Sequence, residues 1–129
     1  MKNIMTLVCL GLLVLTACHG RKVEDVSMPA AGKTDAQLKT AILAGCEDRG
    51  WVCSEVSQGV IEGSLQKGRY LSEVQIPYGK NGYKIVYKNS ENLGYNAKKQ
   101  RIHKAYYKWV IYLNKSIRAA LANPQKYAK

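Results

Sequence analysis

The fold is decided by the stretch from residue 51 to residue 90, WVCSEVSQGVIEGSLQKGRYLSEVQIPYGKNGYKIVYKNS. Short runs rich in Val, Ile, Tyr and Trp alternate there with turn signals, which lie at Gln58-Gly59, Lys67-Gly68 and Asn81-Gly82. Four strands fit this pattern, at about 51–57, 60–66, 69–77 and 83–88. Because the connections are so short, neighbouring strands must run antiparallel. The stretch therefore predicts a four-stranded antiparallel meander.

The alternation within the last predicted strand separates an apolar face from a polar one. Tyr83, Ile85 and Tyr87 share one face, and Lys84 and Lys88 lie on the other. The pattern alone leaves open which of these two faces is exposed.

A helix is predicted to precede the meander. Thr34 and Gln37 form a capping-box pattern at its start, and Gly50 supplies a left-handed stop after Arg49. The helix should therefore cover residues 35–49. Its apolar face is made of Leu38, Ala41, Ile42 and Gly45, with Cys46 at the border.

The clearest helical periodicity lies near the end of the chain, from about Arg101 to Ala122. A continuous apolar stripe is formed by Ile102, Tyr106, Trp109, Val110, Leu113, Ile117 and Leu121. The opposite face carries Lys104, Lys108, Lys115 and Arg118, and Asn123-Pro124 ends the helix.

These elements predict one α+β domain over residues 34–129. A helix, a four-stranded meander and a second helix most simply form a two-layer sandwich with both helices on one sheet face. The other sheet face would then be left to solvent or to a partner.

Residues 1–17 predict a signal peptide. Lys2 gives a positive start, and residues 4–17 carry no charge. As a helix this run would measure about 21 Å against roughly 30 Å of hydrocarbon, which is too short to span a bilayer. Its side chains are apolar on all sides, which argues against a buried amphipathic helix.

The residues that end this run, Leu15-Thr16-Ala17-Cys18, resemble the lipobox of bacterial lipoproteins. The resemblance implies cleavage before Cys18, lipidation of its thiol and acylation of the new amino group. In that family an Asp after the lipidated Cys often means inner-membrane retention. Here His19 follows, which by resemblance favours the outer membrane, facing the periplasm. Residues 18–33 would then form the lipidated Cys and a flexible tether that lets the domain stand off the membrane.

A second resemblance covers about the C-terminal half of the chain. Its motifs are Ile76-Pro77-Tyr78, Tyr83-Lys84-Ile85-Val86-Tyr87, Asn89-Ser90-Glu91-Asn92-Leu93-Gly94-Tyr95 and Ile102-His103-Lys104-Ala105-Tyr106-Tyr107-Lys108-Trp109. They look like small, uncharacterised lipoproteins of Gram-negative bacteria. The resemblance supports the fold and an envelope location, and it implies no chemistry.

Cys46 and Cys53 are the cysteines that remain after the leader is removed and Cys18 is lipidated. In an oxidising compartment they are candidates for a disulfide across the Gly50 turn. Two buried thiols at the seam between helix and sheet are the alternative. Their spacing of six intervening residues, with no second ligand pair, argues against a metal or redox site.

The net charge of +11 is unevenly placed along the chain. Residues 92–129 hold nine Lys and Arg and no acid, whereas residues 18–91 are nearly neutral at +1. The row of Lys104, Lys108, Lys115 and Arg118 is therefore the best candidate for binding an anionic envelope component or protein. A solvated helix face is the plain alternative. Nucleic acid is not expected as a partner in the envelope.

No catalytic constellation stands out, and neither a cofactor nor a metal is predicted. His19 and His103 have no carboxylate or nucleophile close to them in sequence. Glu55, Glu62 and Glu73 fall on separate strands and would make a hydrolase only if they converged. We therefore expect a non-enzymatic lipoprotein that docks through its basic helix. The alternative is an assembly or interaction module that uses an exposed, Tyr-bearing sheet face, with an envelope hydrolase as a weaker option.

Overall fold

The computed structural model describes residues 20–127, so the predicted signal peptide, Cys18 and His19 lie outside the described residues. The strands are β1 (Arg21–Lys22), β2 (Val26–Met28), β3 (Val52–Ser57), β4 (Val60–Lys67), β5 (Tyr70–Gly79), β6 (Gly82–Glu91) and β7 (Arg101–Ile102). The helices are α1 (Asp35–Arg49), α2 (Lys104–Ala122) and α3 (Pro124–Tyr127).

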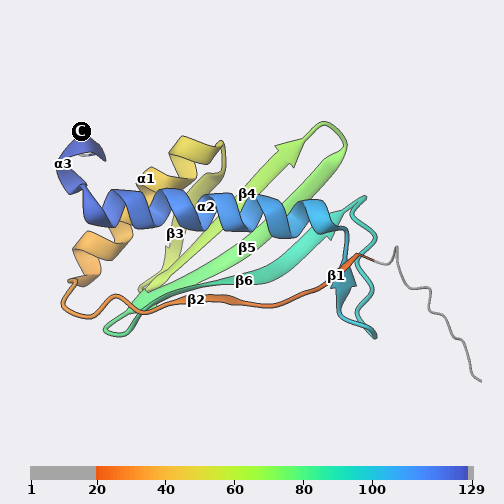
Figure 1. The fold of residues 1–129 in the computed structure, drawn as a ribbon, viewed down its shortest axis with the longest axis horizontal. Coiled ribbons are helices and arrows are strands. Elements are labelled where there is room, and N and C mark those ends of the chain that lie inside the picture. The colour runs from red at the N-terminus through yellow and green to blue at the C-terminus, as the bar shows by residue number, and fades with distance from the viewer. Residues whose placement is uncertain (1–19, 128–129) are drawn as a thin grey trace, which may run out of the picture.

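The main sheet has five antiparallel strands in the order β2-β6-β5-β4-β3, and α1 and α2 pack on one of its faces (Figure 1). The α+β class and the meander of β3 to β6 agree with the sequence. The number of strands does not, because β2 adds a fifth strand at the edge of β6. The segment Val26–Met28 pairs there with Tyr83–Ile85.

The stretch expected to be a flexible tether is partly built into the domain, which corrects that expectation. Besides β2, the two residues of β1 pair with β7, with Arg21 opposite Ile102. Val23, Val26 and Met28 pack against the core. These apolar side chains, two to five residues apart, anchor the segment on the domain.

The first helix has the predicted bounds because both of its ends are fixed locally. The Thr34 hydroxyl accepts from the backbone N–H of Gln37 at 3.1 Å, and the Gln37 side chain accepts from the Thr34 N–H at 2.9 Å. Gly50 follows the helix at a φ of 79°, a left-handed conformation that Gly adopts readily.

The second helix begins at Lys104, three residues later than predicted. Arg101 and Ile102 are taken up by the pairing with β1, and His103 caps the helix. The Nδ1 atom of His103 accepts from the backbone N–H of Ala105 at 3.0 Å. The end at Ala122 is as predicted.

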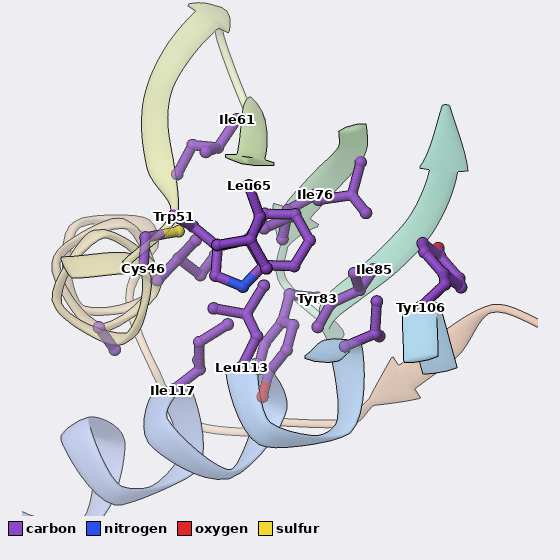
Figure 2. Close-up of a cluster of buried hydrophobic side chains, with 14 of the residues drawn as sticks. Cys46, Trp51, Ile61, Leu65, Ile76, Tyr83, Ile85, Tyr106, Leu113 and Ile117 are labelled. Carbon is purple, nitrogen blue, oxygen red and sulfur yellow. The ribbon is translucent and has the colours of Figure 1, made fainter. Parts of the chain in front are cut away.

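The core lies between the helices and the sheet (Figure 2). Its largest fully buried side chains include Leu38 and Ile42 of α1, Ile61, Val74, Ile76 and Ile85 of the sheet, and Tyr106, Val110, Leu113 and Ile117 of α2. One buried polar contact crosses the layers, where the Tyr83 hydroxyl donates to Oδ1 of Asn114 at 2.5 Å. This contact ties α2 to β6 at a fixed register.

Candidate functional site

The exposed face of α2 carries the four cations that were predicted from the sequence to bind an anionic partner. Lys104, Lys108, Lys115 and Arg118 are all exposed, as the amphipathic pattern requires. They extend over about 21 Å of helix. The ion pairs found within residues 20–127 involve other residues, so these four cations have no carboxylate partner there. Such an uncompensated row attracts anions.

A shallow groove of about 640 Å³ lies beside the N-terminal half of this row. Its polar and aromatic lining consists of Arg21, His103, Lys104, Tyr107, Lys108 and Tyr112. The Arg21 guanidinium lies 4.0 Å from the centroid of the Tyr107 ring. Sequence reasoning missed Arg21, because only the long-range pairing of β1 with β7 brings it to α2.

Three cations lie near the ring of Tyr112, which lines the same groove. Its ring centroid lies 5.2 Å from the Arg49 guanidinium, 5.7 Å from the Lys115 ammonium and 6.0 Å from the Lys108 ammonium. A cation over the face of an aromatic ring is attracted by the ring's electron density, which holds these side chains near Tyr112. The groove therefore offers several donors to a phosphate or carboxylate group.

His103 also lines this groove, and histidine is a common catalytic residue. Here its side chain caps the start of α2. Its Nδ1 atom accepts the helix-capping bond from Ala105, so that nitrogen is not available as a base. The lining holds no carboxylate and no thiol. The cationic and hydroxyl groups of the lining suit the binding of an anion.

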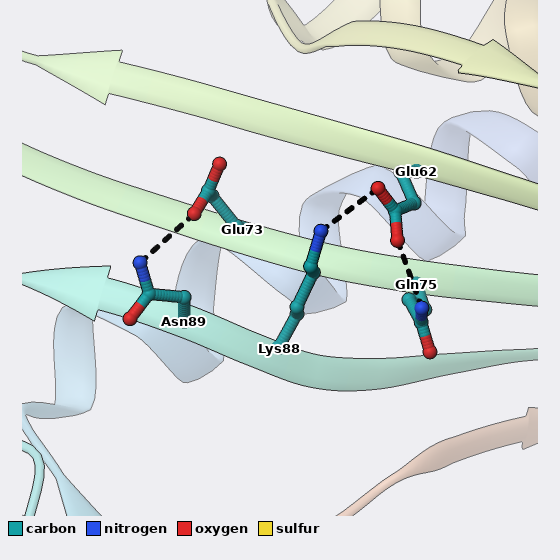
Figure 3. A network of polar contacts seen from close by, with 5 residues as sticks. All are labelled: Glu62, Glu73, Gln75, Lys88 and Asn89. Atoms are coloured by element: carbon teal, nitrogen blue, oxygen red, sulfur yellow. Dashed lines mark hydrogen bonds and ion pairs between the residues drawn. The ribbon is translucent and has the colours of Figure 1, made fainter. Parts of the chain in front are cut away.

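The three glutamates considered for hydrolysis each have a different partner. The Glu62 carboxylate accepts from Lys88 at 2.8 Å and from Gln75 at 2.8 Å, and Glu73 accepts from Asn89 at 2.9 Å (Figure 3). The pairing of β5 with β6 shifts between Glu73 and Val74, so Lys88 is an extra residue between the ladder partners Tyr87 and Asn89.

The pKa shifts of Glu55 and Glu62 also argue against a general acid at either position. The Lys88 ammonium, helped by Gln75, lowers the pKa of Glu62. The Tyr78 hydroxyl and the Lys39 ammonium lower the pKa of Glu55. A general acid at neutral pH needs a raised pKa, which is the opposite direction. These glutamates therefore act as surface acceptors in the sheet.

The predicted disulfide is confirmed. Cys46 of α1 is bonded to Cys53 of β3, with the two Cα atoms 6.2 Å apart. A Cβ atom built on Gly63 of β4 would lie 2.6 Å from the Cys53 sulfur, so the bridge needs a glycine at that position of the neighbouring strand. The bond fixes the end of α1 on the first strand of the meander.

The open face of the sheet differs from the expected Tyr-bearing surface. Tyr83 and Tyr87 point to the helix side, where they contact Asn114 and Tyr106 of α2. Tyr70 likewise packs against Trp109 of α2. On the edge strand β3, the apolar side chains of Val52 and Val56 are 75% and 53% exposed.

Comparison with known proteins gives no information about this site. No family model, no curated protein and no solved structure matches this chain. Within residues 20–127, no three His, Cys, Asp or Glu side chains are placed to hold a metal ion. None of the helices in that range combines the length and the apolar character that crossing a bilayer requires.

Proposed function

We propose that the chain is a lipoprotein anchored through Cys18 whose domain docks on an anionic envelope partner through the exposed face of α2. The observation that carries the docking is the row of Lys104, Lys108, Lys115 and Arg118, which no carboxylate within residues 20–127 neutralises. The adjacent groove adds Arg21, so five cations converge on one side of the molecule. The domain acts by binding and performs no catalytic step. It belongs on the periplasmic side of the outer membrane.

The docking is tested by photocrosslinking in intact cells that express the full chain. A photocrosslinking amino acid replaces Ile111, which is half-buried and lies within the basic row. We expect crosslinks to one envelope component, and we expect raised salt to remove them because exposed charges are screened. Reversal of the four cations, as Lys104→Glu, Lys108→Glu, Lys115→Glu and Arg118→Glu, should abolish them.

The matched control reverses four exposed cations elsewhere, as Lys67→Glu, Arg69→Glu, Lys80→Glu and Lys84→Glu. This variant has the same net charge as the first, and its crosslinks should persist. Circular dichroism checks that both variants fold. Crosslinks that are unchanged when the α2 row is reversed, or lost equally in the control, contradict the proposal.

A second candidate function is protein interaction through the edge strand β3. Val52 and Val56 are exposed there, and β3 is the terminal strand of the sheet order, with one edge unpaired. A strand of a partner protein would extend the sheet along this edge. With the photocrosslinking amino acid in place of Ser54, this function predicts a crosslink that Val52→Thr with Val56→Thr removes. Reversal of the α2 charges should leave it intact.

A further inference from the structure

The chain leaves the described part of the molecule beside the N-terminal end of α2 (Figure 1). Arg21 pairs with Ile102, and a side chain on Gly20 would lie 2.4 Å from the Ile102 carbonyl oxygen. The Arg101 guanidinium donates to the Gly20 carbonyl at 3.3 Å. The exit point is therefore held against the element that carries the basic row.

This exit point leaves a very short link to the proposed anchor. Cys18 precedes Gly20 by two residues, a covalent span of about 7 Å at most. If Cys18 carries lipid, as proposed above, Gly20 stays within that distance of the headgroup layer. A longer tether through residue 33 would have let the domain stand off, but β1 and β2 remove that freedom.

The surface around the exit point is strongly basic. Besides Arg21, Lys104 and Lys108, the segments that meet there carry the exposed cations Lys22, Lys98, Lys99 and Arg101. The acids on these segments are Glu24, Asp25 and Glu91. The cations thus outnumber the acids at the end of the domain that the anchor would hold at the membrane.

We infer that the anionic partner of α2 is the phospholipid headgroup layer of the membrane that holds the Cys18 lipid, and that α2 lies along this layer. The short link places the groove at headgroup depth, and phosphate groups there match its cations. Tyr107 and Tyr112 suit this depth, because a phenol ring packs among apolar groups while its hydroxyl stays hydrated. The open sheet face is then turned away from the membrane.

The orientation along the layer follows from the distribution of charge. Lys115 and Arg118 lie about 16 and 21 Å along the helix from Lys104. If the domain stood on the end that carries Gly20, these two cations would lie beyond the roughly 8–10 Å reach of the surface charge. With α2 parallel to the layer, all four cations of the row contact it.

The test places a nitroxide label on the lipidated full chain, reconstituted into vesicles of phosphatidylcholine with or without phosphatidylglycerol. The disulfide occupies Cys46 and Cys53, and lipid occupies the Cys18 thiol, so an introduced cysteine is the free thiol of the processed protein. Three variants carry the label: Ile111→Cys and Ala122→Cys on the basic face, and Gln75→Cys on the open sheet face. Accessibility to a water-soluble paramagnetic reagent is measured for each.

With phosphatidylglycerol present, we expect a several-fold loss of accessibility at positions 111 and 122 and no change at position 75. Without it, all three labels should be accessible. Added Lys104→Glu and Lys115→Glu should restore accessibility at positions 111 and 122, whereas the matched pair Lys80→Glu and Lys84→Glu should not.

Three outcomes overturn the inference. Protection at position 111 without protection at position 122 contradicts the orientation along the layer. Protection at position 75 contradicts the choice of α2 as the docking face, and no protection at any position contradicts the choice of partner. The last outcome, with no label protected, can occur while the crosslinks from position 111 in cells still depend on the α2 charges. The proposed function then survives, with an acidic protein as the partner. A failure of the protein to float with phosphatidylcholine vesicles instead contradicts the anchor itself.

Discussion

The Arg21 guanidinium lies 4.0 Å from the centroid of the Tyr107 ring, across 86 residues of sequence. This contact and the pairing of β1 with β7 hold the start of the domain against α2. A cation over an exposed aromatic ring is worth about 0.5–1 kcal/mol, enough to bias a short segment but not to stabilise a whole domain.

The first prediction concerns how the segment before β2 is held. Gly20→Ala should release β1, because the new Cβ would lie 2.4 Å from the Ile102 carbonyl oxygen and the residue has a φ of +73°. Amide hydrogen exchange should become faster at Val23, whose N–H donates to the Gln100 carbonyl at 2.7 Å, while global stability changes little. Gly32→Ala is the matched control, since Gly32 has a φ of +83° and open space around it. Equal exchange at Val23 in both variants would show that the β1 contact is not needed.

The second prediction concerns the contact between the two main helices. Gly45 of α1 lies so close to Ile117 of α2 that an added Cβ would be 2.5 Å from its Cγ1 atom and 2.8 Å from its backbone nitrogen. Gly45→Ala should lower the free energy of unfolding by about 1–2 kcal/mol, because forced helix separation outweighs the gain in helix propensity. Gly79→Ala has nothing within 4 Å and should change stability by less than about 0.5 kcal/mol. Denaturant unfolding of both variants compares them, and a neutral or stabilising Gly45→Ala would contradict the packing.

The third prediction concerns the disulfide. Replacing both Cys46 and Cys53 by Ala should lower the free energy of unfolding by about 2–3 kcal/mol, the chain-entropy value for a loop of this size. Gly63→Ala should destabilise the bridged protein, because the new Cβ would lie 2.6 Å from the Cys53 sulfur. In the bridge-free background that clash is gone, so the same substitution should be tolerated. Additive effects in this double-mutant cycle would show that Gly63 is not kept small by the sulfur.

The fourth prediction is a pH dependence of the contact between Glu55 and Tyr78. The Tyr78 hydroxyl and the Lys39 ammonium lower the pKa of Glu55 below its ordinary 4.5, so the contact stabilises the fold above that pH and is lost in acid. The hydrogen bond to Glu55 raises the pKa of Tyr78 from 10.0 to about 12, so the contact persists below pH 10 and is lost as the pH rises through about 12. Tyr78→Phe should therefore destabilise the protein most between these limits.

A double-mutant cycle of Tyr78→Phe with Glu55→Gln, measured by urea unfolding across pH, checks this behaviour. The coupling free energy should be greatest near neutral pH and should fall in acid. A coupling that grows as the pH falls below 4.5 would contradict the assignment, because it would mean that the protonated carboxyl makes the stronger contact.

Local signals explain what could be predicted of the fold. The capping box at Thr34 and the left-handed Gly50 set both ends of α1, and the Gly turns set the meander. The fifth strand was not predictable, because Val26–Met28 is too short to show an alternation and pairs with residues far along the chain. The late start of α2 has the same origin, since Ile102 pairs with Arg21.

The candidate site likewise contains residues that a local sequence pattern predicts and one that only long-range pairing places. The four cations of α2 follow from helical spacing, which the sequence displays directly. The place of Arg21 in the groove depends on a pairing between segments about 80 residues apart, for which a two-residue strand carries no pattern. The open sheet face was predicted to bear Tyr, but the core draws those rings inward, where Tyr87 packs against Tyr106.

The placement of α2 on the membrane depends most on the lipid at Cys18, and one mass measurement tests for that lipid directly. Trypsin cleaves after Arg21, so the processed protein should release the peptide from Cys18 to Arg21 as its N-terminus. We predict that this peptide, from protein purified out of bacterial membranes, carries a diacylglyceryl thioether on Cys18 and an acyl group on the amino nitrogen. An unmodified Cys18 in a chain that still begins at Met1 would contradict the anchor, and with it the placement of α2 on the membrane.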